Sequence, residues 1–85
     1  MKNYNEINMI NKMKHSIGFD REKIKKGKFF FSRNHYSIDF CEDLELAVFY
    51  KLAEKHKGLS RYYSLTQKGL DMLSEILDCE LIKRE

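Results

Sequence analysis

The sequence predicts a small α+β domain in which about three helices pack on a short three-stranded antiparallel sheet, in the order αββαβα. Apolar residues recur at three- and four-residue spacing in three segments, which is typical of helices with one buried face. Aromatic runs lie between these segments and favour strands. Because 85 residues suffice for only one domain, residues 1–85 are predicted to share a single core.

Residues 3–17 are predicted to form the first helix. Asn3 is a suitable N-cap, and Gly18 suits the left-handed position that ends a helix. The apolar residues of the predicted buried face are Tyr4, Ile7, Ile10, Met13 and Ile17.

Residues 28–33 and 35–38 favour two strands. The Arg33–Asn34 step could make a tight reversal between them, because Asn tolerates a positive φ. The alternative is one longer, bulged strand across 29–38. Side chains alternate along a strand, so Phe29–Phe31 cannot all face one side. Unless both faces are covered, at least one Phe is therefore expected to be exposed.

Residues 40–57 are predicted to form the second helix, ended by Gly58. Asp39 and Glu42 fit a capping box, and the acidic residues of segment 39–45 suit the positive end of the helix dipole without a metal. The predicted core residues of this helix are Leu46, Phe49, Tyr50, Leu52 and Ala53.

A strand across 61–65 is predicted to lead directly into the third helix, with Thr66 as its N-cap. The tail at 79–82 either extends this helix or folds back over the core. The apolar residues that define the helical face are Leu70, Leu73, Ile76 and Leu77.

No motif predicts catalysis, a cofactor or a metal site. The three histidines have neither HxxxH nor HExxH spacing, the glycines form no phosphate-binding loop, and no GxSxG is present. Cys41 and Cys79 are expected to be reduced core side chains. Because these motifs are missing, a non-enzymatic protein is expected. The chain contains no apolar run of about 18 residues and no signal-peptide core, so a cytoplasmic protein is expected.

The strongest functional candidate is the basic stretch 21–33, which runs into three Phe residues. Cations that neutralise phosphates beside rings that stack on bases are typical of nucleic-acid contacts. The same residues also fit a solvated turn, a surface for an acidic protein, or one that occupies a nucleic-acid-binding groove on another protein. The candidate contact residues are Arg21, Lys23, Lys25, Lys26, Lys28 and Arg33, followed by Asn34, His35 and Tyr36.

Residues 63–70, YSLTQKGL, followed by Leu73, resemble the wing-to-helix passage of winged-helix regulators. The resemblance implies a wing tip at Leu59–Arg61, with Arg61 as a phosphate contact. A winged helix also has two helices before its wing. Since residues 40–57 are predicted to be a single helix, the resemblance supports a strand–helix unit more than the reading of DNA.

The whole chain resembles a family of small proteins from phages and prophages of low-GC Gram-positive bacteria. Segments 15–20, 27–28, 33–36 and 65–70 carry this resemblance: HSIGFD, GK, RNHY and LTQKGL. The resemblance implies a phage accessory protein that binds a macromolecule in the host cytoplasm, for instance as an inhibitor of a CRISPR-type defence nuclease or as a regulator. Direct binding of DNA or RNA is the alternative. A homodimer is compatible with so small a core.

Overall fold

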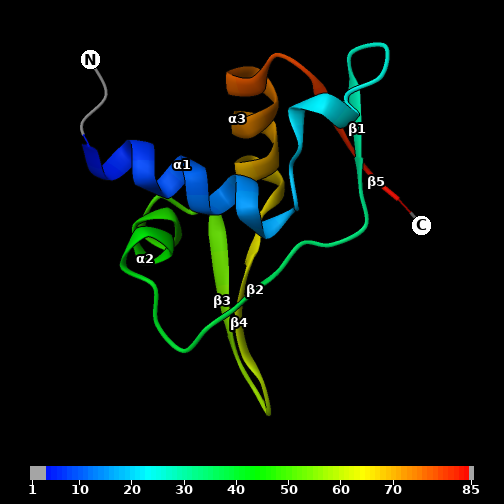
Figure 1. Cartoon of the computed structure of the whole chain (residues 1–85). Coiled ribbons are helices and arrows are strands. Elements are labelled where there is room, and N and C mark those ends of the chain that lie inside the picture. The colour runs from blue at the N-terminus through cyan, green and yellow to red at the C-terminus, as the bar shows by residue number, and fades with distance from the viewer. Residues whose placement is uncertain (1–3, 85) are drawn as a thin grey trace.

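The computed structural model describes residues 4–84, which contain three α-helices, a 3₁₀ turn and two small sheets (Figure 1). The predicted small α+β fold is confirmed. The elements in chain order are α1 (Tyr4–Ser16), η1 (Arg21–Lys23), β1 (Lys28–Phe31), β2 (Tyr36–Ser37), α2 (Glu42–Phe49), β3 (Ala53–Lys57), β4 (Arg61–Leu65), α3 (Gln67–Leu77) and β5 (Glu80–Lys83).

The main sheet is antiparallel, with strand order β2-β4-β3. In its long hairpin, which extends away from the helices (Figure 1), Lys55 lies opposite Tyr63 and His56 opposite Tyr62. Since side chains alternate, Tyr63 points into the core, where it is fully buried, and Tyr62 points to the other side of the sheet, where it is half-buried. The hairpin therefore has a core side and a solvent side.

The second sheet is a parallel pair formed by β1 and β5, with Phe29 opposite Leu81 and Phe31 opposite Lys83. Phe29 and Phe31 are buried, whereas Phe30 is 45% exposed. Of the two possibilities for these Phe residues, the structure has the one in which a Phe is exposed. Of the two possibilities for the tail, the structure has the one in which the chain folds back.

The core lies between α1, α2, α3 and the inner sides of the two sheets. Its largest fully buried side chains are Met13, Leu44, Tyr63 and Leu73. Gly18 ends α1 with φ +65°, as predicted. The predicted cap, Asn3, lies outside the described residues.

Thr66 caps α3 as predicted, since its hydroxyl accepts a hydrogen bond from the Gly69 amide at 3.1 Å. Gly69 in turn lies directly against the backbone of Leu52. A Cβ at this position would overlap the Leu52 carbonyl, and that carbonyl already accepts a hydrogen bond from the Thr66 amide at 3.0 Å. The first turn of α3 therefore packs directly against Leu52, the residue that precedes β3.

The predicted single helix over 40–57 is wrong. Helix α2 ends at Phe49, Lys51 adopts a left-handed φ of +64°, and the chain enters β3 at Ala53. Pairing with β4 outweighs the helical propensity of residues 53–57, because a strand is stabilised by partners that are distant in sequence.

Several details of the predicted second helix are therefore wrong as well. The N-cap is Cys41, with no side-chain hydrogen bond, so Asp39 does not cap. Gly58 lies in the loop of the β3–β4 hairpin and ends no helix. Phe49 is 77% exposed and Tyr50 is also exposed, because the helix presents Leu44 and Ala47 to the core instead.

The predicted tight reversal at Arg33–Asn34 is also wrong, and so is the alternative of one bulged strand. Strands β1 and β2 belong to different sheets. The Asn34 side chain donates to the Leu65 carbonyl at 3.1 Å and accepts from the Leu65 amide at 2.8 Å. The Asn34 amide group thereby replaces a backbone partner for the end of β4 and keeps the connecting segment extended.

Within residues 4–84, no helix is both long and apolar enough to cross a bilayer.

Candidate nucleic-acid interface

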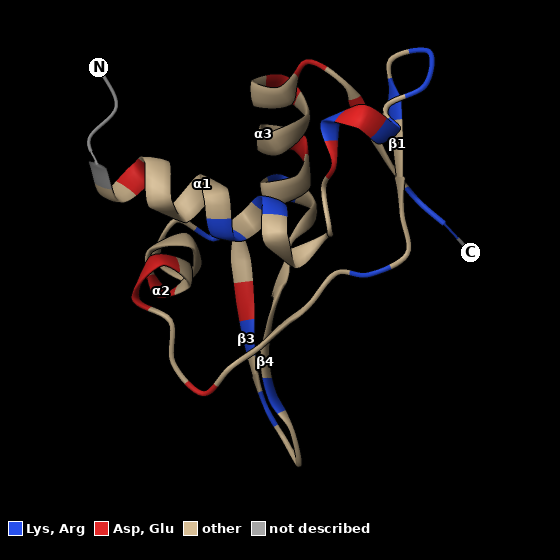
Figure 2. Ribbon diagram, viewed as in Figure 1, with Lys and Arg blue, Asp and Glu red and all other residues tan. Residues whose placement is uncertain are grey.

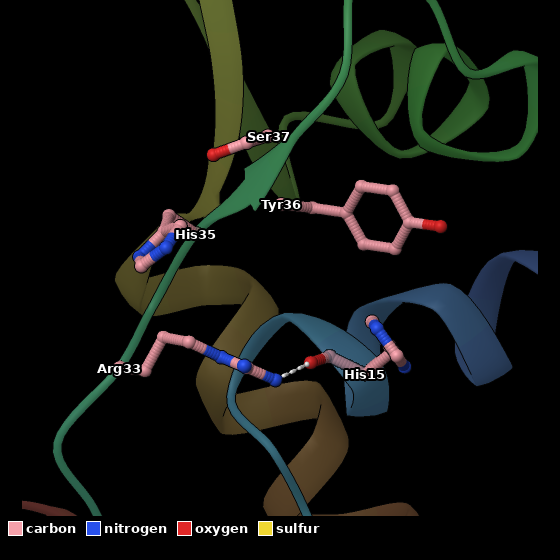
Figure 3. A pocket seen from close by; sticks show the side chains of 5 residues that line it. All are labelled: His15, Arg33, His35, Tyr36 and Ser37. Carbon is pink, nitrogen blue, oxygen red and sulfur yellow. Dashed lines mark hydrogen bonds between the residues drawn. The ribbon is translucent and has the colours of Figure 1, made fainter.

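Segment 32–37 is the centre of the candidate site and is fixed at three points. Asn34 is bound to Leu65, as described above. The His35 amide donates to the carbonyl of Ser16 at 3.0 Å, and the Arg33 guanidinium donates to the carbonyl of His15 at 2.7 Å (Figure 3). The segment is therefore held between the end of α1 and the sheet.

A first cavity of about 360 Å³ opens between this segment and α1. In Figure 3, Arg33 and Tyr36 reach toward His15, while His35 and Ser37 point to the other side of the segment. The Tyr36 ring lies 5.1 Å from the His15 ring, and the Lys12 ammonium lies 5.6 Å from its centre. The lining residues are His15, Arg33, His35, Tyr36 and Ser37.

A second cavity of about 510 Å³ opens on the solvent side of the sheet. Tyr62 forms one wall. The His56 ring is stacked on the Tyr62 ring with centres 4.4 Å apart and planes at 14°, and His35 approaches Tyr62 edge-on at 6.3 Å. The lining residues are Ser32, Arg33, Asn34, His35, Ser37, Tyr62 and Lys83. Arg33, His35 and Ser37 line both cavities, which are therefore neighbours.

The two cavities adjoin across the edge strand β2, with Tyr36 on the side of α1 and Tyr62 on the solvent side, and we call the surface around this edge the basic–aromatic face. We define it by the residues Lys12, His15, Arg33, His35, Tyr36, Ser37, His56, Tyr62 and Lys83. No carboxylate lines either cavity. Glu54 lies two residues along β3 from His56, on the same side of the sheet as His56 and Tyr62.

The sequence-predicted contacts divide into two groups. Arg33, His35 and Tyr36 lie on the basic–aromatic face, and Arg61 begins β4 directly before Tyr62. Asn34 lines the second cavity, but its amide is engaged with Leu65.

The other predicted residues precede β1. Lys25 and Lys28 close a tight turn through two backbone hydrogen bonds of 2.9 Å, with Lys26 and Gly27 between them at positive φ. This pair of left-handed residues defines a type I′ turn. Lys25, Lys26 and Lys28 line none of the cavities described here, and Arg21 lies in η1 with its guanidinium 5.7 Å from the Phe19 ring.

Lys23 connects the two groups. It lines a third cavity, of about 420 Å³, together with Arg33 and Arg84. Figure 2 shows basic residues in α1, in the turn before β1 and in the hairpin, with acidic residues among them in α1, η1 and β3 and at the start of α2. The positive charge is therefore spread over several elements.

Six residues of this surface were not among the predicted contacts: Lys12, His15, Ser37, His56, Tyr62 and Lys83. His56 was assigned to a helix, which concealed its pairing with Tyr62. A signal was present in the strand at 61–65, because alternation already placed Tyr62 and Tyr63 on opposite sides. Lys83 reaches the face only through the parallel pairing of β5, which leaves no local signal.

On the core side of the sheet, a second polar cluster ties α2 to the hairpin. The Tyr63 hydroxyl donates to the Glu45 carboxylate and accepts from the Cys41 amide at 3.2 Å, and Lys55 bridges Glu45 at 3.0 Å. The hydrogen bonds from Tyr63 and Lys55 lower the pKa of Glu45. Burial and the bond to Glu45 raise the pKa of Tyr63. We call these three side chains the Glu45 clamp.

The two cysteines are free and buried, as predicted, and burial raises the pKa of the Cys79 thiol. Residues 4–84 contain no group of three or more His, Cys, Asp or Glu side chains placed to hold a metal ion.

Comparison of the chain with protein-family models, with curated proteins and with solved structures gave no match.

Proposed function

We propose that the protein acts by binding nucleic acid through the basic–aromatic face, without catalysis. The observation that carries this proposal is the pair of adjoining cavities whose charged side chains are all cationic. Their remaining lining groups are imidazoles, hydroxyls, two phenols and an amide. Cations and hydrogen-bond donors of this kind bind phosphate oxygens, and aromatic rings stack on bases.

The surroundings of the face support the same proposal. Arg84 shares a cavity with Arg33. With Lys12 and Lys83, four full positive charges lie on or next to this surface. Arg61 begins β4, where alternation places its side chain on the side of the sheet opposite Tyr62. If three to four phosphates are neutralised, the slope of log affinity against log salt is roughly −2 to −4, at about 0.7–0.9 for each phosphate.

The test is a fluorescence-anisotropy titration with labelled single-stranded DNA, duplex DNA and RNA at low and physiological salt. We expect Arg33→Glu to weaken binding by roughly 10- to 100-fold, because a hydrogen bond to a charged group contributes about 1.5–3 kcal/mol. Lys25→Glu is the matched control, since it changes the net charge equally at an exposed residue outside the cavities. It is expected to change affinity by less than about threefold.

Arg33 also holds the carbonyl of His15, so thermal melting of both variants must accompany the titration. If wild-type protein binds none of the three ligands at low salt, the proposal fails. Equal losses in the two variants would also contradict it, because they would reflect net charge rather than this face.

A second candidate function is binding to a protein, and a separate observation favours it. Phe40 is 62% exposed, Phe49 is 77% exposed, and Leu59 at the hairpin loop is fully exposed. Aromatic rings are enriched at protein–protein contacts, and the exposed rings of Phe49 and Tyr50 adjoin with their centres 5.5 Å apart. In the context of the phage resemblance, such a partner would be a host defence complex of the CRISPR type.

This candidate is tested by cleavage assays with a purified CRISPR effector from a low-GC Gram-positive host. Inhibition that is lost in Phe49→Ser but kept in Arg33→Glu would support a protein partner. Inhibition that is lost in Arg33→Glu alone would assign the effect to the basic–aromatic face.

A further inference from the structure

We infer that the basic–aromatic face takes a single nucleic-acid strand rather than a duplex, with a phosphate in the first cavity and an unpaired base against Tyr62 in the second. This inference rests on the proposed function and specifies its ligand.

The first cavity has the chemistry of a phosphate site. Arg33 donates one N–H to the carbonyl of His15, and this hydrogen bond fixes the guanidinium. The other N–H groups of the guanidinium are available to an anion. Tyr36 adds a hydroxyl group, and no carboxylate competes for the donors. His15 adds an imidazole, which can donate in either protonation state.

The second cavity has the chemistry of a base site. Its wall, Tyr62, is a half-buried ring on the solvent side of the sheet, braced by the stacked ring of His56. His56 is itself held by the Ser64 hydroxyl, which lies 2.8 Å from its Nε2. A braced ring beside an open cavity is a stacking platform, and every base offers a face to it. The volume also lies within the usual range for small-ligand sites, about 300–1,000 Å³.

The two sites are arranged for one chain. Arg33, His35 and Ser37 form the wall that they share, so a strand that crosses this wall can place its phosphate on one side and its base on the other. Strand β2 lies at the edge of its sheet, where such a crossing is open. A base that is paired inside a duplex has its faces covered by its neighbours and cannot stack on Tyr62.

The helix that would have to enter a duplex groove is also unsuited to it. Helix α2 is the helix that the described structure has between β2 and β3, and its first turn carries Glu42, Asp43 and Glu45. Glu45 is bound by Tyr63 and Lys55, but the carboxylates of Glu42 and Asp43 would repel the phosphates of a groove. The hairpin is present where the winged-helix resemblance implies a wing, with residues 58–60 at its loop, but the helix that precedes it, α2, is acidic in its first turn.

The experiment compares Tyr62→Ala and Tyr62→Phe in anisotropy titrations with a labelled oligo(dT) strand and with a duplex of the same length. We expect Tyr62→Ala to weaken binding of the single strand by about 5- to 100-fold and Tyr62→Phe to leave it unchanged, because stacking requires a ring and not a hydroxyl. The wild type should bind the duplex more weakly than the single strand, and the affinity for the duplex should change by less than about twofold in either variant. Tyr50→Ala is the matched control, an exposed tyrosine at the end of α2 that lines neither cavity.

A second measurement covers the case in which Tyr62→Ala disturbs the hairpin. The chain has five Tyr and no Trp, so its intrinsic emission comes from tyrosine. Oligo(dT) should quench part of this emission in the wild type, and the quenched part should disappear in Tyr62→Phe while the affinity persists. A purely structural role of Tyr62 would not produce this loss.

The possible failures can be told apart. If duplex and single strand bind equally and Tyr62 variants affect neither, the single-strand inference is overturned while nucleic-acid binding stands. Equal losses for both ligands in Tyr62→Ala, with unchanged quenching in Tyr62→Phe, would overturn it as well. If no nucleic acid binds to the wild type at low salt, the proposed function itself fails.

Discussion

The Glu45 clamp gives the most direct test of how the fold is held together, through the substitution Tyr63→Phe. The Tyr63 ring is fully buried, so Phe preserves its packing and removes only the hydroxyl. The hydroxyl donates to the Glu45 carboxylate and accepts from the Cys41 amide. The substitution therefore removes two hydrogen bonds that join α2 to the hairpin and leaves the apolar contacts in place.

The expected loss can be worked from these two bonds. A hydrogen bond to a charged group contributes about 1.5–3 kcal/mol, and a buried amide left without a partner costs about 1–3 kcal/mol. Glu45 keeps its bridge to Lys55 and is about one-third exposed, so water replaces part of the first contribution. We expect the free energy of unfolding to fall by about 2–4 kcal/mol, out of roughly 4–13 kcal/mol for a chain of this length.

The assay is urea unfolding followed by circular dichroism, with the midpoint and the slope fitted for each variant. Tyr62→Phe is the matched control, because no hydrogen bond of its hydroxyl occurs within the described residues and its ring lies on the solvent side. The control should stay within about 0.5 kcal/mol of the wild type. If Tyr63→Phe also stays within that range, the clamp does not stabilise the fold and the reasoning is refuted.

Two further predictions concern the same framework. The pKa of Glu45 is lowered in the folded protein, so its contribution to stability is present above the ordinary carboxyl pKa and is lost as the pH falls through the acid range. Glu45→Gln should therefore flatten the dependence of the urea midpoint on pH between about 6 and 3, whereas the exposed Asp71→Asn, in α3, should leave the curve parallel to that of the wild type. Gly69→Ala should destabilise the fold by more than about 2 kcal/mol despite the better helix propensity of Ala, because its Cβ would overlap the Leu52 carbonyl. A neutral or stabilising result in thermal melting, with Glu75→Ala at an exposed position of α3 as the helical comparison, would contradict this close approach.

The parts of the fold that local chemistry specifies could be predicted from the sequence. Thr66 caps α3 and Gly18 ends α1 because each acts on residues within one helical turn. The α+β class likewise follows from the periodicity of the apolar residues. Residues 53–57 could not be predicted in this way, because charged residues at this density favour a helix in isolation and adopt a strand only beside β4.

The candidate site was predictable only in part, for the same reason. Arg33, His35 and Tyr36 are neighbours in sequence and were identified together. The rest of the face comes from α1, β3, β4 and β5, whose approach depends on pairings between residues that are far apart in the chain. The lysines of the turn before β1 were predicted as contacts because the segment is rich in basic residues, but they line neither cavity.

Strand β4 unites the determinants of folding and of the proposed binding in two consecutive residues. Tyr63 points to the core and carries the Glu45 clamp, while Tyr62 points to solvent and forms the wall of the second cavity. Because side chains alternate along the strand, the two tyrosines lie on opposite sides of the sheet. A substitution of one therefore leaves the contacts of the other in place. Tyr63→Phe should thus lower stability and leave affinity for oligo(dT) unchanged at temperatures where the variant is folded, whereas Tyr62→Ala should lower that affinity with a smaller effect on stability. If both substitutions lowered stability and affinity in the same proportion, the loss of binding would be a consequence of unfolding and the solvent side of β4 would have no separate role.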